Sequence, residues 1–434
     1  MRNAPHRLAP GVRRVTSALT RPCKNTRASA PATRSTARSG IGQKTASLSF
    51  MLPSRQIAPV LSKWEGAGRL ASGSARAKNK HRARDEGKSM RIAIFDDGIS
   101  YDGTTAETQA LGGVERAVIA LARAFSGLGH EVTVLNRCPG EQVIDGVHWR
   151  PLPEDWASEP PLAATDALIA VRDPALLAGA AEAGARVLWA LAAPAYLGTA
   201  SARGVLQVLR PALVVPSLAS YNALPVGGAT VIVPGVEAVF HPDPAGVPAD
   251  PPVAVVTTHP AHGLAELLDL WRLMIHPAVP TARLHIYSSV LYRGLTAALP
   301  LPPALRTVAD SALALAARGV EVRAPLPAAG MARVYREARV HLYPGHAQDM
   351  VGWTLADSQA CGLPAVARMR GAAGERLVNG QTGYLVPDDE ALANVAIQLL
   401  SHEGMWRVQA EEAARPERRR SWEAVARAFE RLMM

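Results

Sequence analysis

Residues 349–364 read DMVGWTLADSQACGLP, and two aspartates flank the start of a predicted helix within them. The helix is expected from about Thr354 to Ala360, because a glycine and a proline follow it directly. Asp349 precedes the helix, and Asp357 lies within it, eight residues further on. Both side chains can therefore face the same binding site. Carboxylates suit such a site because they accept hydrogen bonds from the paired hydroxyl groups of a sugar or ribose.

The start of this predicted helix is a second candidate binding element. The free N–H groups around Thr354 and Leu355 would point toward an anion such as a diphosphate. A purely structural alternative stays open, in which Asp349 caps the helix and Asp357 lies on a solvated face. On the residues alone, the structural alternative is the stronger one for both aspartates.

Strands and helices alternate on both sides of a proline-rich segment. Residues 241–252 contain five prolines, which interrupt any sheet or helix, so this segment is predicted to be a linker. In residues 253–420, short apolar strands such as Val253–Thr257 and Val340–Tyr343 alternate with helices. A last, amphipathic helix is expected in residues 421–434.

Residues 90–240 show the same rhythm. The strand Ile92–Phe95, the helix Val114–Leu128 and the strand Glu131–Leu135 predict a βαβ unit. Parallel strands joined by crossover helices imply a doubly wound sheet. The predicted fold class is therefore α/β, with two doubly wound Rossmann-like domains that face each other across a cleft. Ligands are expected in that cleft, beyond the carboxyl ends of the strands.

Gly112 and Gly113 lie between the first strand and its helix. Paired glycines allow a ligand to approach the backbone closely, and the following helix N-terminus favours an anion. The functional interpretation is contact with a phosphate or with a sugar near it. The structural interpretation is a tight loop before a helix. The pair does not belong to a GxGxxG motif, so the residues alone do not decide between the two.

Two histidines follow the first strand of the second domain, within Thr258–Leu264. His262, directly before Gly263, can meet a phosphate at the start of the next helix. His259 is interpreted as an ordinary loop histidine. No nearby acidic residues complete a set of metal ligands, so no metal site is expected.

The positive charge of the chain is unevenly distributed. Residues 1–89 contain 19 Lys and Arg against three acidic residues, a net charge of +16, which leaves −6 for the remainder of a chain with +10 in total. Nucleic acid is therefore not expected as a partner of the folded part. We interpret residues 1–89 as the product of a mis-assigned start ahead of Met90. A targeting peptide and a disordered basic tail are the alternatives.

Cysteine usage and hydropathy bear on location. The three cysteines, Cys23, Cys138 and Cys361, fit neither a disulfide framework nor a zinc site. No apolar run reaches the roughly 20 residues that a membrane span needs. A cytoplasmic protein with at most peripheral membrane contact is the resulting expectation.

Residues 349–364 resemble the E-x7-E signature of the family-4 glycosyltransferases, which are retaining enzymes of the GT-B fold. Asp349 and Asp357 take the two acidic positions, and four further residues match directly: Gly352, Ala360, Gly362 and Pro364. The likeness extends from Met90 to the C-terminus. It includes the glycine pair 112–113 and four other segments: Val233–Val236, Gly371–Glu375, Asn379–Val386 and Ser421–Glu423.

The resemblance implies that a hexosyl-type sugar passes from a nucleotide diphosphate sugar, with UDP or GDP, to a carbohydrate or glycoconjugate acceptor. The anomeric configuration would be retained, and no cofactor or metal would be needed. Asp349 would hold the sugar hydroxyls and Asp357 the ribose, as the catalytic pair. The donor phosphates would be bound by residues of both domains: Gly112, Gly113, His262, Gly263, Gly352, Thr354 and Leu355.

The chain departs from the family pattern in four places. Both signature glutamates are aspartates, and His262 stands where the family usually has Arg or Lys. Residues 189–194 contain no histidine, although most members have one near there. These departures favour, as an alternative, a non-catalytic nucleotide-sugar-binding protein of the same fold. A sugar-nucleotide epimerase is the third hypothesis.

Overall fold

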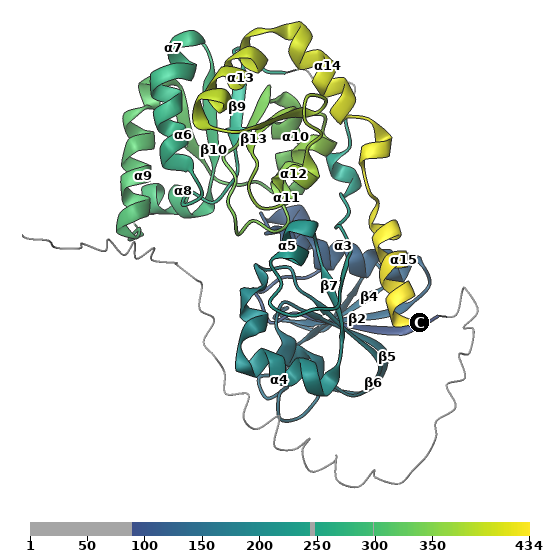
Figure 1. Ribbon diagram of the computed structural model, residues 1–434. Helices are drawn as coiled ribbons and strands as arrows, with labels where there is room; N and C mark the ends of the chain where they lie inside the picture. The colour runs from purple at the N-terminus through teal and green to yellow at the C-terminus, as the bar shows by residue number, and fades with distance from the viewer. Residues whose placement is uncertain (1–88, 244–247, 298) are drawn as a thin grey trace, which may run out of the picture. The chain divides into compact units, whose positions relative to one another are not determined.

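The computed structural model describes residues 89–243, 248–297 and 299–434, which build two β-sheets covered by helices (Figure 1). The predictions made for residues 1–88 lie outside this part of the chain, and so does the middle of the predicted linker.

The first sheet contains eight strands in the order β3-β4-β2-β1-β5-β6-β7-β8. Neighbouring strands pair in parallel, except that β3 runs antiparallel to β4. The bounds are β1 (Arg91–Phe95), β2 (Glu131–Asn136), β3 (Gln142–Ile144), β4 (Val147–Pro151), β5 (Leu162–Val171), β6 (Ala180–Trp189), β7 (Ala212–Val215) and β8 (Ala229–Val231).

Helices cover both faces of the first sheet, because successive side chains of a strand point to opposite faces. In β1, Ile92 and Ile94 belong to the core formed with α3 (Gly113–Gly127), whereas Ala93 and Phe95 belong to the core on the other face. The remaining helices of this domain are α2 (Thr105–Thr108), η2 (Pro174–Ala178), η3 (Pro194–Gly198), α4 (Ala200–Leu209), α5 (Leu218–Asn222) and η4 (Ala238–Phe240).

The second sheet contains six strands in the order β11-β10-β9-β12-β13-β14, all paired in parallel. Their bounds are β9 (Val253–Val256), β10 (Arg283–Tyr287), β11 (Val320–Arg323), β12 (Val340–Tyr343), β13 (Ala365–Arg368) and β14 (Gly383–Val386). Both faces are apolar here as well, which explains the unbroken Val and Ala runs of β9 and β13.

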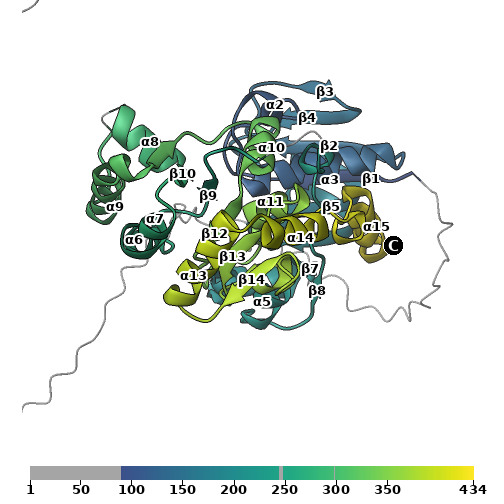
Figure 2. The same ribbon diagram turned by 90° about the horizontal axis from the view of Figure 1, so that it is seen from above.

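Many helices pack around the second sheet (Figure 2). They are α6 (Leu264–Leu270), the π-helical η5 (Trp271–Ile275), α7 (His276–Ala278), α8 (Ser289–Thr296), α9 (Pro303–Ala314), η6 (Ala316–Arg318), α10 (Ala328–Glu337), α11 (Trp353–Ala360), α12 (Ala373–Arg376), α13 (Asp389–Ser401), α14 (Glu403–Ala413) and η7 (Pro416–Arg418).

The last helix, α15 (Trp422–Met433), packs onto the first sheet and not the second. Val425 and Phe429 are fully buried in the core that also contains α3, and the Phe429 ring lies edge-on to Trp189 at 5.3 Å. Figure 1 shows α15, in yellow, beside α3, in blue. The end of the chain therefore completes the core of the first domain.

Each sheet has one point at which the strand order reverses direction. In the first sheet it lies between β1 and β5, and in the second between β9 and β12. In open α/β sheets, ligands bind beyond the carboxyl ends of the strands at such a switch point. The loops that follow these four strands are therefore the expected positions of binding or catalytic residues.

Several elements differ from the sequence-based expectations. The sequence predicts strands only at Ala167–Val171 and Arg186–Trp189, whereas β5 and β6 each run over ten residues and begin earlier. The hairpin of β3 and β4 was not predicted, because its strands are short and mostly not buried. The helix predicted from Leu264 changes after Leu270 into a π-helical turn.

Candidate functional site

Asp349 lies in the loop between β12 and α11, at the switch point of the second sheet. Its Oδ1 accepts hydrogen bonds from the N–H of Gly352 at 2.9 Å and of Val351 at 3.3 Å. The hydroxyl of the buried Tyr343 donates to its Oδ2. The carboxylate therefore holds the loop in place before α11, but it does not act as the helix cap of the structural alternative, because the N-cap residue is Gly352 and no side chain caps it. Oδ1 thus accepts two hydrogen bonds, whereas Oδ2 keeps a lone pair for a further donor.

Asp357 faces inward from α11, and its side chain is 8% exposed. Its Oδ2 lies 2.5 Å from Nη2 of Arg116, which comes from α3 of the first domain. Arg116 also donates to Glu237 at 3.0 Å. Burial raises the pKa of Asp357, and the Arg116 charge opposes that shift. The alternative that placed Asp357 on a solvated face is wrong, because Arg116 of the first domain covers this side of α11.

Gly113 of the glycine pair lies directly against the start of α11. A Cβ on Gly113 would approach the Trp353 ring to 2.1 Å, and one on Gly112 would approach a carboxylate oxygen of Glu115 to 2.4 Å. Trp353 is the first residue of α11, so the two predicted glycine and helix motifs meet although they are far apart in the sequence. Gly113 is needed for this close packing, whereas Gly112 leaves room for the Glu115 carboxylate.

The N-terminus of α11 is formed by Gly352, Thr354 and Leu355, as expected. Gly352 precedes the helix in the left-handed conformation, at φ 65°, which glycine adopts without strain. The side chain of Leu355 is fully buried in the core, so that only its N–H can serve a ligand. The N–H groups of a first helical turn have no acceptor within the helix, which leaves them for an anion.

Three histidines gather at this switch point. His259 and His262 follow β9, and His346 follows β12. The rings of His262 and His346 are stacked, with centroids 4.0 Å apart and planes within 6°. The His259 ring lies 5.2 Å from that of His262. We call these three residues the histidine cluster. His259, interpreted from the sequence as an ordinary loop residue, is part of it.

Two members of the histidine cluster, His259 and His262, have lowered pKa values. Burial lowers the pKa of His262 to about 4, and His346 and His259 lower it further, whereas Asp349 acts in the opposite direction. Burial also lowers the pKa of His259, with a contribution from His346. An anion bound beside the rings would reverse these shifts, because it favours the protonated form.

Gly263 gives the backbone the turn that leads from the histidines into α6. It has φ 86°, and a Cβ would come within 2.8 Å of Pro344. A side chain at this position would be strained as well as crowded. The position therefore keeps the loops after β9 and β12 close together.

Arg376 is a basic residue of the site that the sequence did not reveal. Its Nε donates to the carbonyl oxygen of Val351 at 2.7 Å, directly behind the start of α11. Burial lowers its pKa, and the charges of Glu375, Asp349 and Asp357 act against that shift. The adjacent motif residue Glu375 was quoted from the sequence, but nothing there distinguished Arg376.

Further contacts join this loop region to the first domain. The carboxylate of Glu375 accepts the N–H groups of Leu218 and Ala219, both at 2.8 Å, at the start of α5. The hydroxyl of Ser217 donates to the carbonyl oxygen of Met350 at 2.6 Å. These partners are more than 130 residues apart along the chain, so no local pattern indicates them.

A surface hollow of about 570 Å³ lies elsewhere, between α3, α15 and the segment after β8. Its charged lining residues are Arg123, Glu237, Glu423 and Arg427. None of the predicted site residues lines it, so the chemistry of the switch-point loops does not depend on it.

Within the described residues, no group of three or more His, Cys, Asp or Glu side chains is arranged to hold a metal ion. That part of the chain also contains no helix with the length and apolar character needed to cross a membrane.

The two parallel sheets with their switch points define the GT-B fold, in agreement with the fold class predicted from the sequence. Sucrose-phosphate synthase from Thermosynechococcus elongatus shares the fold, with a TM-score of 0.59 and 16% identity over 79% of this chain and 98% of that one. HepE from Anabaena, solved in complex with UDP-glucose, has a TM-score of 0.58 and 14% identity over 79% and 98% of the two chains.

Residues 253–402 form a domain that matches the family described as Glycosyl transferases group 1. A D-inositol 3-phosphate glycosyltransferase from Kribbella flavida is 36% identical over 95 residues. That match covers 20% of this chain and 22% of the relative's length. The matched domain contains β12, α11 and the histidine cluster.

Proposed function

We propose that the chain is a glycosyltransferase that moves a sugar from a nucleoside diphosphate sugar to an acceptor. The observation that carries the proposal is the histidine cluster beside the Asp349 loop that leads into α11, at the switch point of the domain that matches Glycosyl transferases group 1. The UDP-glucose complex of HepE supports this class of donor.

The donor diphosphate would lie between the first turn of α11 and the histidine cluster. The helix end supplies N–H donors and a partial positive charge. His262 would take up a proton as the anion binds, and so replace the basic side chain that the family usually has there. The backbone at Gly112 and Gly113 would approach the donor from the first domain.

Asp349 would accept hydrogen bonds from the donor sugar while it continues to hold the loop through Gly352. Asp357 would contact the ribose, with Arg116 fixing its carboxylate. The protein would act mainly by positioning the two substrates and stabilising the leaving diphosphate. The leaving phosphate can take the acceptor's proton, so no separate protein base is required in this proposal.

Retention of configuration and hexosyl transfer are part of the proposal. NMR of the product formed from an α-linked donor tests both, because the anomeric coupling and the sugar ring are read directly. An α-linked hexoside is expected, and a β-linked product would overturn the retaining mechanism.

A second candidate is a non-catalytic nucleotide-sugar-binding protein. The buried contact between Asp357 and Arg116 favours it, because the carboxylate proposed for the ribose already has a charged partner. An epimerase of similar fold is a third possibility. Release of free nucleoside diphosphate that depends on an added acceptor separates the transferase from both. Donor binding without such release would support the binding protein.

A further inference from the structure

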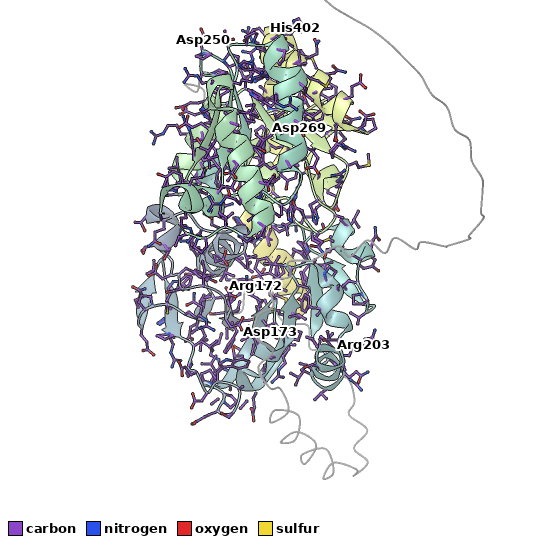
Figure 3. The ribbon with its side chains drawn as sticks, turned by 90° about the vertical axis from the view of Figure 1, so that its left-hand side faces the viewer. Arg172, Asp173, Arg203, Asp250, Asp269 and His402 are labelled. Atoms are coloured by element: carbon purple, nitrogen blue, oxygen red, sulfur yellow. The ribbon has the colours of Figure 1, made fainter. Side chains whose placement is uncertain are left out.

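A second group of charged side chains lies at the switch point of the first sheet. Asp96 and Asp97 directly follow β1, and Arg172 and Asp173 directly follow β5. Figure 3 labels Arg172 and Asp173 in this part of the first domain. Glu115 joins them from the first turn of α3. The sequence analysis singled out none of these residues.

The inner layer of this group is an ion-pair network. Asp96 is fully buried, and its Oδ1 lies 2.5 Å from Nη2 of Arg172. The Tyr101 hydroxyl donates to the other carboxylate oxygen of Asp96 at 2.8 Å. The buried Glu115 lies 3.7 Å from Nη1 of Arg172. The single guanidinium is thus shared by two buried carboxylates.

The backbone of Arg172 is held in an unusual conformation to make these contacts. Its φ is +66°, in the left-handed region that residues with a side chain rarely adopt. A Cβ on Gly98 would come within 2.3 Å of the Arg172 guanidinium. The loop after β1 is therefore fitted around this arginine.

The outer layer consists of Asp97 and Asp173, which are both half-buried. Burial raises the pKa of Asp97, and so does the Asp96 charge, whereas Arg172 and Arg137 lower it. Burial likewise raises the pKa of Asp173, and the Asp97 charge adds to the shift. Arg137 itself donates to the backbone carbonyl oxygen of Asp97 at 2.9 Å.

Tyr196, in η3 after β6, completes the outer layer. Its hydroxyl oxygen is buried and has no hydrogen-bond partner among the described residues. Burial raises the pKa of this hydroxyl, the Asp173 charge adds to the shift and the Arg172 charge opposes it, so both charges lie within electrostatic reach of the hydroxyl. A buried hydroxyl without a partner costs free energy. It therefore indicates a missing polar group that would fill this place.

We propose that the first-sheet switch point binds the acceptor, and that the acceptor is a polyhydroxylated compound with a protonated amino group. This inference rests on the proposed function, because only a transferase has an acceptor. Four carboxylates, from Asp96, Asp97, Glu115 and Asp173, face two guanidinium groups, so the site has an excess of negative charge. Asp97 and Asp173 would accept hydrogen bonds from the ammonium group. The Tyr196 hydroxyl would form a hydrogen bond with a hydroxyl group of the acceptor.

The same charges act against a phosphorylated acceptor. Arg172 is occupied by Asp96 and Glu115, so no free guanidinium of that residue faces outward for a phosphate. The relative from Kribbella flavida carries inositol 3-phosphate in its name, and the two proteins would differ in this respect. The charge of the acceptor group is therefore the property that the site selects.

Ligand-observed NMR on the full chain tests the proposal with three matched probes: glucosamine, glucose and glucose 6-phosphate. At a pH where the amine is protonated, glucosamine should bind tightest and glucose 6-phosphate weakest. Asp173→Asn should weaken the binding of glucosamine by about tenfold or more and leave the binding of glucose nearly unchanged. Asparagine still accepts the N–H of Ala175, so the fold of the loop is preserved. Tyr196→Phe should weaken both sugars.

Asp310→Asn, at an exposed position of α9 in the other domain, is the control and should bind all three probes like the parent. Equal binding of the three probes, a preference for the phosphate ester, no binding at all, or no effect of Asp173→Asn would overturn the proposal. Donor binding by calorimetry separates the two proposals. If no nucleotide sugar binds and glucosamine still depends on Asp173, the transferase proposal fails and the cationic site stands.

Discussion

Arg116, in α3 of the first domain, forms two ion pairs, one of them with the second domain. One nitrogen contacts Asp357 of the second domain, and another contacts Glu237 in the segment after β8. Burial disfavours its charge, but the two carboxylates raise its pKa above the ordinary value. Such a buried pair is costly to break, because one charge is left without a partner.

Arg116→Met should lower the free energy of unfolding by about 3–5 kcal/mol, because Asp357 and Glu237 stay buried without a cation. Adding Asp357→Asn in the same chain should recover part of the loss. Urea denaturation of both variants measures this. Arg333→Met, at an exposed position of α10, is the control. If Arg116→Met lowers the free energy of unfolding no more than this control does, the ion pairs of Arg116 do not stabilise the fold.

Asp357 also allows a test of the ribose assignment. Asp357→Asn should weaken binding of the free nucleoside diphosphate by about one to two powers of ten, because a charge-assisted hydrogen bond contributes about 1.5–3 kcal/mol. Isothermal calorimetry measures it, with unfolding followed in parallel because Arg116 loses its partner. Unchanged affinity in a folded variant would place the ribose elsewhere.

At this scale the sequence predicted which residues open α11 but not what they meet. The spacing of Asp349, Gly352 and Asp357 indicated a loop and a helix start correctly. The partner of Asp357 lies 241 residues away, and only the packing of the two domains joins them. His346 was missed because a single histidine in a loop carries no pattern.

Among the elements, α11 is tied to the sheet by a buried histidine. His341, on β12, is fully buried, and its Nδ1 lies 2.8 Å from the Ser358 hydroxyl of α11. Its Nε2 lies 2.9 Å from the Thr257 hydroxyl after β9. Burial lowers the pKa of His341 to about 3. The folded state therefore requires the neutral ring.

This requirement predicts acid sensitivity. The folded pKa of His341 lies below the unfolded value, so its stabilising effect is present above pH ~6.5 and is lost as pH falls toward the folded pKa. At about pH 4.5 the loss should be roughly 2–3 kcal/mol, from 1.36 kcal/mol for each pH unit. Urea denaturation at about pH 7.5 and 4.5 tests it, and His341→Gln should flatten the dependence by that amount.

His262 and His285 have pKa values lowered to about 4 and would add to the acid sensitivity of the parent. The difference between the parent and His341→Gln isolates the contribution of His341. The same pH slope in both proteins would show that the His341 ring does not control the stability of this region.

Element boundaries were predictable where apolar runs are continuous and not where they stop. The apolar runs predict strands at Ala212–Val215, Arg283–Tyr287 and Val340–Tyr343, and β7, β10 and β12 have these bounds because each is a short buried run. β5 begins at Leu162, although residues 162–166 contain mainly Ala, Thr and Asp. Its first part forms a strand because it pairs with β6, which a local pattern does not reveal.

In the whole molecule, both sheets place their polar groups at a switch point. The first carries the carboxylate-rich group after β1 and β5, and the second carries the histidine cluster after β9 and β12. The rhythm of strands and helices and the proline-rich linker predicted two doubly wound domains. The placement of carboxylates at one switch point and histidines at the other was not predictable, because it depends on which strands become neighbours.

Donor binding should survive removal of divalent metal ions. The α11 N-terminus and the histidine cluster would supply the positive potential for the diphosphate. Calorimetry of a bound nucleotide sugar before and after excess EDTA measures this, with added Mg²⁺ or Mn²⁺ as the control. Loss of binding with EDTA and its return with the metal would show that an ion neutralises the phosphates instead.

The central claim is that the loop and helix start at Asp349 bind the sugar of an intact nucleotide donor. Calorimetric titration of the parent and of Asp349→Asn tests it with UDP-, GDP- and ADP-sugars and with the matching free diphosphates. At least one nucleotide sugar should bind the parent. Asp349→Asn should lower the affinity for that nucleotide sugar by about one to two powers of ten and leave the affinity for the free diphosphate nearly unchanged. Absence of donor binding, or equal binding of the sugar by both proteins, would contradict the claim.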